Sequence, residues 1–186
     1  MTPEITKCAT ISIKSISQET YLKLQQDAYD SDQDWPLTVY EKEFSYENYG
    51  FFIYPHDSQA QSDSKNIPED LQKCLNAMRQ NDCDFLSLDS DITDIPIVTH
   101  CLTISTAHIK REDLARLQTE PNIGVYKKDN LGTHNIGIYV YVNRFANNKL
   151  KSLQKCIQYA KDQGCEIICF DSDGPIMPEL PVYKYD

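Results

Sequence analysis

The stretch Leu71-Gln-Lys-Cys74 is written a second time, unchanged, as Leu153-Gln-Lys-Cys156. Three further matches follow one order along the chain, at offsets of 82 or 93 residues: Cys8-Ala-Thr-Ile-Ser12 with Cys101-Leu-Thr-Ile-Ser105, Cys83 with Cys165, and Leu88-Asp-Ser-Asp91 with Phe170-Asp-Ser-Asp173. Ordered matches of this kind indicate an internal duplication. We therefore expect two domains, a first repeat over residues 1–98 and a second repeat over residues 99–186.

The chain length of 186 residues gives each repeat enough sequence for a modest core of its own. No run of about 18 apolar residues occurs, so the sequence predicts no membrane span. The first residues, Met-Thr-Pro-Glu-Ile-Thr-Lys, lack the basic and apolar regions of a secretory signal. A cytoplasmic location is the expectation.

Six of the seven cysteines form duplicated pairs, and the seventh, Cys169, has no counterpart. The pairs are Cys8 with Cys101, Cys74 with Cys156, and Cys83 with Cys165. A disulfide inside each repeat, such as one between Cys8 and Cys74, stays open as an alternative. No spacing typical of a four-ligand zinc site is present. We expect reduced, buried cysteines that behave as small apolar side chains, and no metal.

The net charge of −10 is divided unevenly between the repeats. Residues 1–98 carry 18 Asp and Glu against 7 Lys and Arg, which gives −11. Residues 99–186 carry 10 against 11, which gives +1. A charged face usually serves solubility, but an asymmetry this large predicts that the first repeat presents an acidic surface.

Each repeat is predicted to contain the same six elements, from β-branched runs and helical apolar spacing. The first repeat has strands at 8–15, 37–41, 50–54 and 84–88, and helices at 17–28 and from Ile67 onward. The second repeat has strands at 101–106, 123–127, 136–142 and 166–170, and helices at 110–118 and 149–163. Gly164 follows the last helix as a C-cap glycine would.

This order predicts an α+β fold, a tandem duplication of a βαββαβ ferredoxin-like (split βαβ) unit. Right-handed crossovers would place both helices on one face of an antiparallel sheet. The open sheet face then needs a partner, which is the other repeat, another protein or a nucleic acid. Continuation of one sheet across both repeats is a further alternative.

The second repeat resembles a family of small uncharacterised domains from plasmids, phages and integrative elements of bacteria. The runs that carry the resemblance are Leu102-Thr-Ile-Ser-Thr-Ala-His-Ile109, Val125-Tyr-Lys127, Gly137-Ile-Tyr-Val-Tyr141 and Phe170-Asp-Ser-Asp-Gly-Pro175, followed by Leu180-Pro-Val-Tyr183. The first repeat looks like a diverged member, with Ile13-Lys-Ser-Ile16 in place of Thr-Ala-His-Ile. The resemblance implies a mobile-element origin and no established activity.

The family-motif residues that could carry chemistry are Ser105, Thr106, His108, Asp171 and Asp173. A Ser/His pair suits nucleophilic catalysis only when the base reaches the hydroxyl, and helix entry is the competing interpretation. The Asp-Ser-Asp runs suit Mg²⁺ only with further oxygen ligands, and turn formation competes with that. We therefore predict no catalytic residues, no metal site and no cofactor.

The candidate partner-binding residues lie where the first repeat is richest in carboxylates and aromatic rings. Aromatic area contributes affinity, and carboxylates steer the approach of a basic protein. These residues are Asp27, Tyr29, Asp30, Asp32, Asp34, Trp35, Glu41, Glu43, Tyr46, Glu47 and Tyr49. The loop 30–34 and the polar insertion 55–65 occur only in this repeat.

The sequence therefore predicts a non-enzymatic binding protein of a mobile element. Its partner would be a basic, nucleic-acid-handling host defence protein, so that it acts as an anti-CRISPR or anti-restriction inhibitor without touching nucleic acid or membrane. The alternatives are a small-molecule-sensing regulatory module, an immunity protein or antitoxin, and a hydrolase or nuclease. The sequence does not indicate an oligomeric state.

Overall fold

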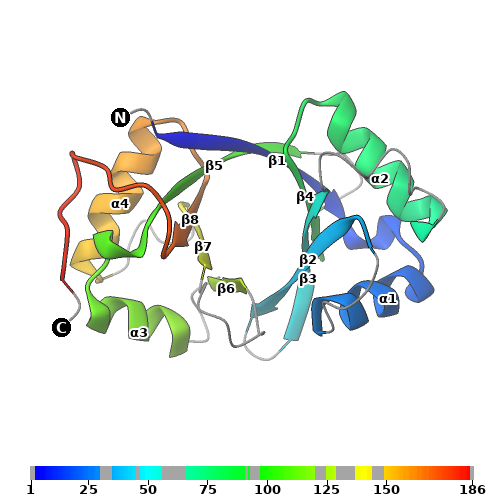
Figure 1. Cartoon of the computed structure of the whole chain (residues 1–186), viewed down its shortest axis with the longest axis horizontal. Coiled ribbons are helices and arrows are strands. Elements are labelled where there is room, and N and C mark those ends of the chain that lie inside the picture. The colour runs from blue at the N-terminus through cyan, green and yellow to red at the C-terminus, as the bar shows by residue number, and fades with distance from the viewer. Residues whose placement is uncertain are drawn as a thin grey trace. The chain divides into compact units, whose positions relative to one another are not determined.

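The computed structural model describes residues 3–29, 35–44, 47–55, 66–90, 92, 97–119, 125–128, 137–143 and 149–184 (Figure 1). The chain forms two compact units. Residues 7–42 and 48–99 make the first unit, and residues 1–6, 43–47 and 100–186 make the second. The predicted duplication is thus visible as two bodies, each with its own core.

The first repeat contains four strands and two helices among its described residues. They are β1 (Glu4–Ser12), α1 (Gln18–Tyr29), β2 (Leu37–Phe44), β3 (Glu47–Pro55), α2 (Glu69–Gln80) and β4 (Phe85–Asp89). A short 3-10 turn, η1 (Ile13–Ser15), joins β1 to α1. The predicted elements are present, with β1 starting four residues earlier than predicted and η1 replacing its last three.

The second repeat follows the same order. Its elements are β5 (Ile97–Ser105), η3 (Thr106–His108), α3 (Arg111–Thr119), β6 (Val125–Lys128), β7 (Gly137–Tyr141), α4 (Lys151–Asp162) and β8 (Ile167–Asp171). The start of β5 at Ile97 lies 93 residues after the start of β1, so the duplication reaches further than the matched letters indicate.

The strand order within each repeat corrects the ferredoxin-like prediction. The neighbours run β2-β3-β4-β1 in the first repeat and β6-β7-β8-β5 in the second. β4 pairs antiparallel with β3 and parallel with β1, and β8 does the same with β7 and β5. The sheets are therefore mixed, whereas a ferredoxin-like unit has its first strand beside its third and all neighbours antiparallel.

Burial explains why the fourth strand takes an inner position. All five residues of β4 are buried, and so are the first four residues of β8. A strand that is buried along its whole length belongs at an inner position of a sheet, because an edge position would expose part of it. An inner place beside the parallel first strand follows from that.

Both helices of each unit cover one face of its strands, as predicted (Figure 1). In the first unit Leu24 of α1 and Leu71, Leu75 and Met78 of α2 pack on alternate residues of the strands. In the second unit Leu117 of α3 and four residues of α4 make the equivalent layer, namely Leu153, Cys156, Ile157 and Ala160. The duplicated apolar positions are thus the two cores.

The turn that ends the second helix of each repeat also recurs. Gly164 has a φ of +72°, and its counterpart Asp82 has a φ of +53°. Cys165 N–H then donates to the Ala160 carbonyl (2.9 Å), as Cys83 N–H donates to the Met78 carbonyl (3.1 Å). The predicted C-cap role of Gly164 is confirmed, and Asp82 adopts the same left-handed backbone at a steric cost.

Across the described ranges, no helix combines the length and apolar character that crossing a bilayer requires.

Candidate functional site

His108, the most suggestive catalytic candidate, is fully buried and holds the C-terminal segment. Met177 N–H donates to its Nε2 (2.9 Å), and its Nδ1 lies 2.8 Å from the Pro181 carbonyl oxygen. These contacts require a neutral ring with the proton on Nδ1, because Nε2 must accept. Both ring nitrogens are engaged by the backbone, so the ring is placed as a structural anchor.

Ser105 and Thr106 form the turn that precedes α3. The Ser105 hydroxyl accepts from Ala107 N–H (3.2 Å), and Thr106 begins η3. Ser12 does the same in the first repeat, where it accepts from Lys14 N–H (3.4 Å). The interpretation of Ser105 as a helix-entry residue agrees with this geometry, and its hydroxyl is not paired with the His108 ring.

Asp171 and Asp173 lie in a turn against the end of β5. Asp171 Oδ1 accepts from Asp173 N–H (3.0 Å), and its carbonyl accepts from Gly174 N–H (3.1 Å). Ser105 N–H donates to the Pro175 carbonyl (2.9 Å), and a Cβ on Gly174 would lie 2.7 Å from the Ile104 carbonyl. The two family motifs therefore touch each other. In the described part of the chain, no three His, Cys, Asp or Glu side chains are grouped to hold a metal.

The first turns of the two helices in each repeat are joined by a hydroxyl and a carboxylate. In the first repeat Thr20 Oγ1 donates to Asp70 (2.7 Å), which also accepts from Ser17 N–H (2.6 Å). Burial of Asp70 opposes ionisation, but these hydrogen bonds outweigh it and lower the pKa of the Asp70 carboxyl. Neither partner was recognised from sequence.

In the second repeat the same two positions hold Asp113 and Ser152, so the carboxylate has moved to the other helix. Ser152 Oγ donates to Asp113 (2.5 Å) and accepts from Lys110 N–H (3.1 Å). Position by position, Asp113 corresponds to Thr20, Ser152 to Asp70 and Lys110 to Ser17. We call these the helix-start contacts.

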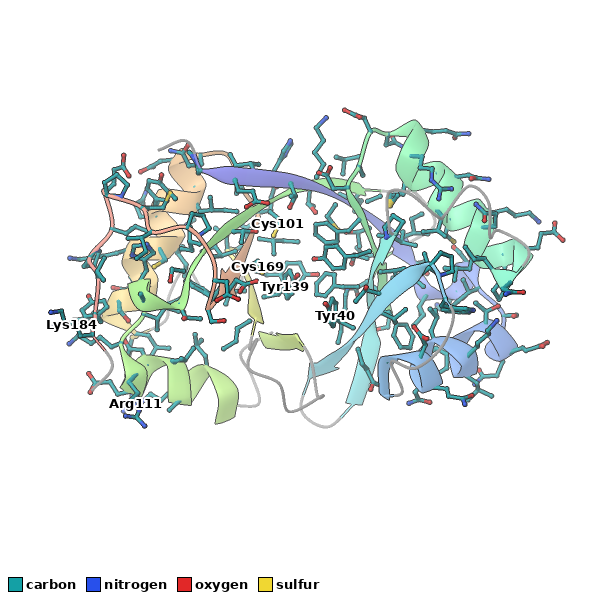
Figure 2. All side chains as sticks on the ribbon, in the orientation of Figure 1. Tyr40, Cys101, Arg111, Tyr139, Cys169 and Lys184 are labelled. Carbon is teal, nitrogen blue, oxygen red and sulfur yellow. The ribbon has the colours of Figure 1, made fainter. Side chains whose placement is uncertain are left out.

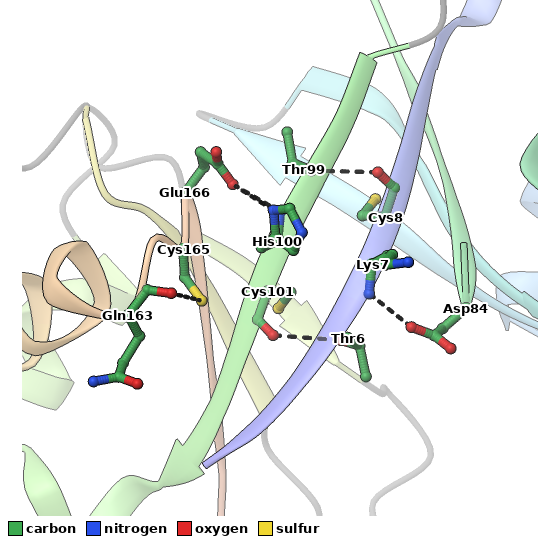
Figure 3. Close-up of polar contacts among 10 residues, drawn as sticks. All are labelled: Thr6, Lys7, Cys8, Asp84, Thr99, His100, Cys101, Gln163, Cys165 and Glu166. Carbon is green, nitrogen blue, oxygen red and sulfur yellow. Dashed lines mark hydrogen bonds and ion pairs between the residues drawn. The ribbon is translucent and has the colours of Figure 1, made fainter. Parts of the chain in front are cut away.

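A second duplicated contact clamps the fourth strand to the first (Figure 3). Lys7 N–H donates to the Asp84 carboxylate (2.6 Å), and His100 N–H donates to the Glu166 carboxylate (2.7 Å). The backbone returns each bond, from Asp84 N–H to the Lys7 carbonyl (2.8 Å) and from Glu166 N–H to the His100 carbonyl (3.0 Å). Asp84 and Glu166 are therefore structural residues.

The predicted partner-binding residues are only partly within the described chain. Asp30, Asp32, Asp34 and Tyr46 lie outside it, and for Tyr29, Glu43, Glu47 and Tyr49 only the backbone is described. Trp35 is half-buried against the core, with Lys23 Nζ 4.4 Å from its ring centre. Asp27 and Glu41 are half-buried, and Glu41 accepts from Gln25 at 3.4 Å. Trp35 therefore packs partly against the core, and its role in partner binding stays a prediction.

Leu22, on α1 of the first repeat, is an exposed apolar residue that the sequence did not single out as a binding residue. Leu22 on α1 is 54% exposed, while its counterpart in α3 is Ala115. Glu19 lies one helical turn before Leu22 and is exposed. α1 runs on to Tyr29 and then to the acidic loop 30–34. Comparison of the aligned helices could have found Leu22, because core positions recur in both copies and this one does not.

A buried cation lies on the face of the first unit's strands that its helices do not cover. Lys42 Nζ donates to Ser87 Oγ (2.5 Å) and to Asp89 Oδ2 (3.1 Å), and it lies 4.6 Å from the Phe52 ring centre. Lys42 is fully buried. Its ammonium group has therefore lost its hydration, and the Asp89 carboxylate, the Ser87 hydroxyl and the Phe52 ring stabilise the charge instead. Tyr54, stacked on Phe85, and Tyr40 continue this face.

The second repeat keeps the lysine, the aspartate and two tyrosines of this cluster, but it has Cys169 in place of Ser87 and Tyr139 in place of Phe52. Tyr126, Lys128, Tyr139, Tyr141 and Asp171 correspond to Tyr40, Lys42, Phe52, Tyr54 and Asp89. Lys128 pairs with Gly137 in the β6–β7 register. Tyr139, Cys101 and Cys169 project from the side of the strands away from α4 (Figure 2). The offset of 86 that joins Tyr40 to Tyr126 also joins Lys42 to Lys128, and that signal was available in the sequence.

All seven cysteines are buried and free, so the disulfide alternative is wrong. Burial raises the pKa of the Cys8 and Cys156 thiols to about 12 and that of Cys74 and Cys165 to about 11. Thiols of this kind stay protonated at neutral pH and are poor nucleophiles.

Comparison with known proteins gives one family. The model of the C-terminal domain of a family of unknown function, DUF5983, matches the chain twice, over residues 8–99 and residues 101–185. No curated protein and no solved structure matches the chain significantly.

Proposed function

The chain belongs to this family of unknown function, and we propose that it acts as a non-enzymatic binding protein whose first repeat occupies a basic site on another protein. The partner is a nucleic-acid-handling host defence protein, and the chain is its anti-CRISPR or anti-restriction inhibitor from a mobile element. Carboxylates would compete there with nucleic-acid phosphates for Lys and Arg.

The observation that carries this proposal is the exposed Leu22 on the acidic copy of a duplicated scaffold. Protein interfaces combine an apolar anchor with a charged rim. The first repeat offers Leu22 at 54% exposure and a charge of −11, whereas the second repeat has Ala115 at that position and a charge of +1. At this helix position the exposed apolar side chain therefore belongs to the acidic copy.

The family-motif geometry supports binding over catalysis. Neither nitrogen of the buried His108 ring is available as a base while Met177 and Pro181 hold them. The raised thiol pKa values argue against a cysteine nucleophile in the same way.

The experiment is an affinity capture from the bacterial host with the full chain as bait, followed by mass spectrometry and an inhibition assay. The wild-type chain should retain a basic nucleic-acid-binding protein at low salt, release it at about 0.5 M salt, and inhibit its action on nucleic acid. Leu22→Ala gives the first repeat the residue of the second and should weaken capture at least about tenfold.

The matched control is Ala115→Ser, which changes the equivalent exposed position of α3 and should leave capture unaltered. Retention that is independent of salt and equal for the wild type and Leu22→Ala would refute the proposal. So would a captured protein whose activity is unaffected by the chain.

A small-molecule-sensing module is the second candidate, and the Lys42–Ser87–Asp89 cluster favours it. Small-molecule sites are lined mostly by apolar and aromatic side chains with a few placed polar or charged groups, and this cluster has that composition. A metabolite panel should then raise the melting temperature of the wild type but not of Lys42→Met, which keeps the apolar stem. If no anion in the panel shifts the wild type, this candidate fails.

A further inference from the structure

The helix-start contact of the second repeat is surrounded by cations. Lys110 and Arg116 lie three residues before and after Asp113, and Lys155 lies three residues after Ser152, so all three flank the contact at helical spacing. Lys149 and Lys151 precede Ser152 at the start of α4, and all five side chains are exposed. We call these five residues the basic helix-start surface.

The first repeat shows that these positions form one surface. Their equivalents, among them Ser17, Lys23, Ile67 and Lys73, line a single open pocket around the Thr20–Asp70 contact. The lining there carries two lysines and three carboxylates, for a charge of −1. The same positions of the second repeat carry five cations and two carboxylates, for a charge of +3. The charge therefore changes from −1 to +3 at a surface whose underlying hydroxyl–carboxylate contact is kept.

We propose that the basic helix-start surface binds the phosphate backbone of a nucleic acid. Affinity for nucleic-acid backbones comes from cations that replace condensed counterions, and it needs no apolar anchor. The large exposed apolar side chains of the second unit's described residues are Ile5 and, in the C-terminal segment, Ile176 and Val182. None belongs to α3 or α4, and the position of Leu22 holds Ala115 here.

The peptide dipoles of α3 and α4 add to this preference, because both helices begin at the surface. Arg111, the first residue of α3, points away from the strands (Figure 2). Lys110 Nζ lies 3.7 Å from Glu112 Oε1. An exposed ion pair of this kind contributes little to stability, so a phosphate can take the place of the Glu112 carboxylate at little cost. The charge of −11 argues against direct nucleic-acid contact by the first repeat, but the basic helix-start surface lies on the second repeat and carries the opposite sign.

The test is fluorescence anisotropy of a labelled mixed-sequence DNA duplex with the full chain. Binding should have a dissociation constant on the order of 10⁻⁵ M at about 0.05 M salt, with a log–log salt slope between about −2 and about −5. Lys151→Gln/Lys155→Gln should weaken binding and reduce the slope by about 2.

The matched control is Lys73→Gln/Arg79→Gln, which removes two exposed cations from α2 of the first repeat and changes the net charge equally. It should bind as the wild type does. The proposal is overturned if the duplex does not bind at the lowest salt, or if both variants lose affinity equally. Polyglutamate that binds as tightly as the duplex would overturn it too, since it would indicate an acidic protein partner. None of these results depends on Leu22 or on a captured host protein.

Discussion

The two helix-start contacts place a hydroxyl against a carboxylate at the same two positions, but the carboxylate comes from opposite helices. Asp70 supplies it from α2 in the first repeat, and Asp113 supplies it from α3 in the second. The scaffold therefore requires the pair and not its orientation. Once the charge can change helices without losing the contact, the surface around it is free to become acidic or basic.

Among the variants that separate the two repeats, Gly50→Ala is expected to lower the free energy of unfolding most. Gly50 has a φ of +136°, and a Cβ would lie 2.0 Å from the Leu88 carbonyl oxygen. We expect the free energy of unfolding to fall by about 4 kcal/mol in urea denaturation. Gly164→Ala is the control, because its Cβ meets nothing within 4 Å and only its φ of +72° is unfavourable. It should cost about 1 kcal/mol, and equal losses would contradict the steric argument.

His108→Ala tests the feature that the first repeat lacks. It leaves a cavity and two unpaired backbone groups, so unfolding should become easier by about 3 kcal/mol. Faster proteolysis of the segment after Asp173 should accompany this loss. The counterpart Ser15 is exposed, and Ser15→Ala should change stability by less than about 0.5 kcal/mol. A C-terminal segment that stays protected in His108→Ala would show that the imidazole does not hold it.

Thr20→Asp makes the first repeat carry two carboxylates at one contact. Their repulsion should lower the free energy of unfolding by about 2 kcal/mol at pH 7. Adding Asp70→Ser recreates the Asp113–Ser152 arrangement and should restore most of the loss. A double variant no more stable than Thr20→Asp would mean that the two contacts are not interchangeable.

Acid titration of the folded chain tests the Thr20–Asp70 contact through the pH dependence of its stability. Because the pKa of Asp70 is lowered in the folded chain, its contribution is present above the ordinary carboxyl pKa and is lost as the pH falls through the lowered value. Asp70→Asn should therefore flatten the loss of stability below about pH 4.

The smallest expected effect concerns the thiols, one from each repeat. The folded pKa of Cys8 and Cys156 is raised to about 12, so their contribution is complete below the unfolded pKa and is lost as the pH rises toward 12. At pH 10 the raised pKa of each thiol should lower the free energy of unfolding by about 1.4 kcal/mol. Cys8→Ala and Cys156→Ala should each flatten the alkaline loss by a similar amount. Unequal slopes of stability against pH would show that the different surface charges of the two repeats alter the pKa of the buried thiols.

The sequence predicted the repeats, their elements and their cores well, because apolar spacing and duplicated letters are local signals. The prediction of which strands lie beside the fourth strand was wrong. The uninterrupted apolar run Ile167–Phe170 indicated burial on both faces and hence an inner position. The element order βαββαβ is correct, but the ferredoxin-like strand order expected from it is wrong.

The candidate sites were harder to predict because they depend on register and on distant partners. Lys42 meets Asp89 only through the pairing of β2, β3 and β4. The partners of His108 lie 69 and 73 residues away, in a segment without regular structure. The prediction of Trp35 as a binding residue came from composition, which does not say that part of its ring packs against the core.

The inner place of β4 and β8 has a consequence for biosynthesis. Each is the last strand of its repeat to leave the ribosome, yet it separates the first strand from the third. Until it arrives, the β2–β3 hairpin and the first strand have no partner for their facing edges, so neither sheet can assemble stepwise during translation. Each repeat is therefore expected to fold in one event, triggered by its final residues.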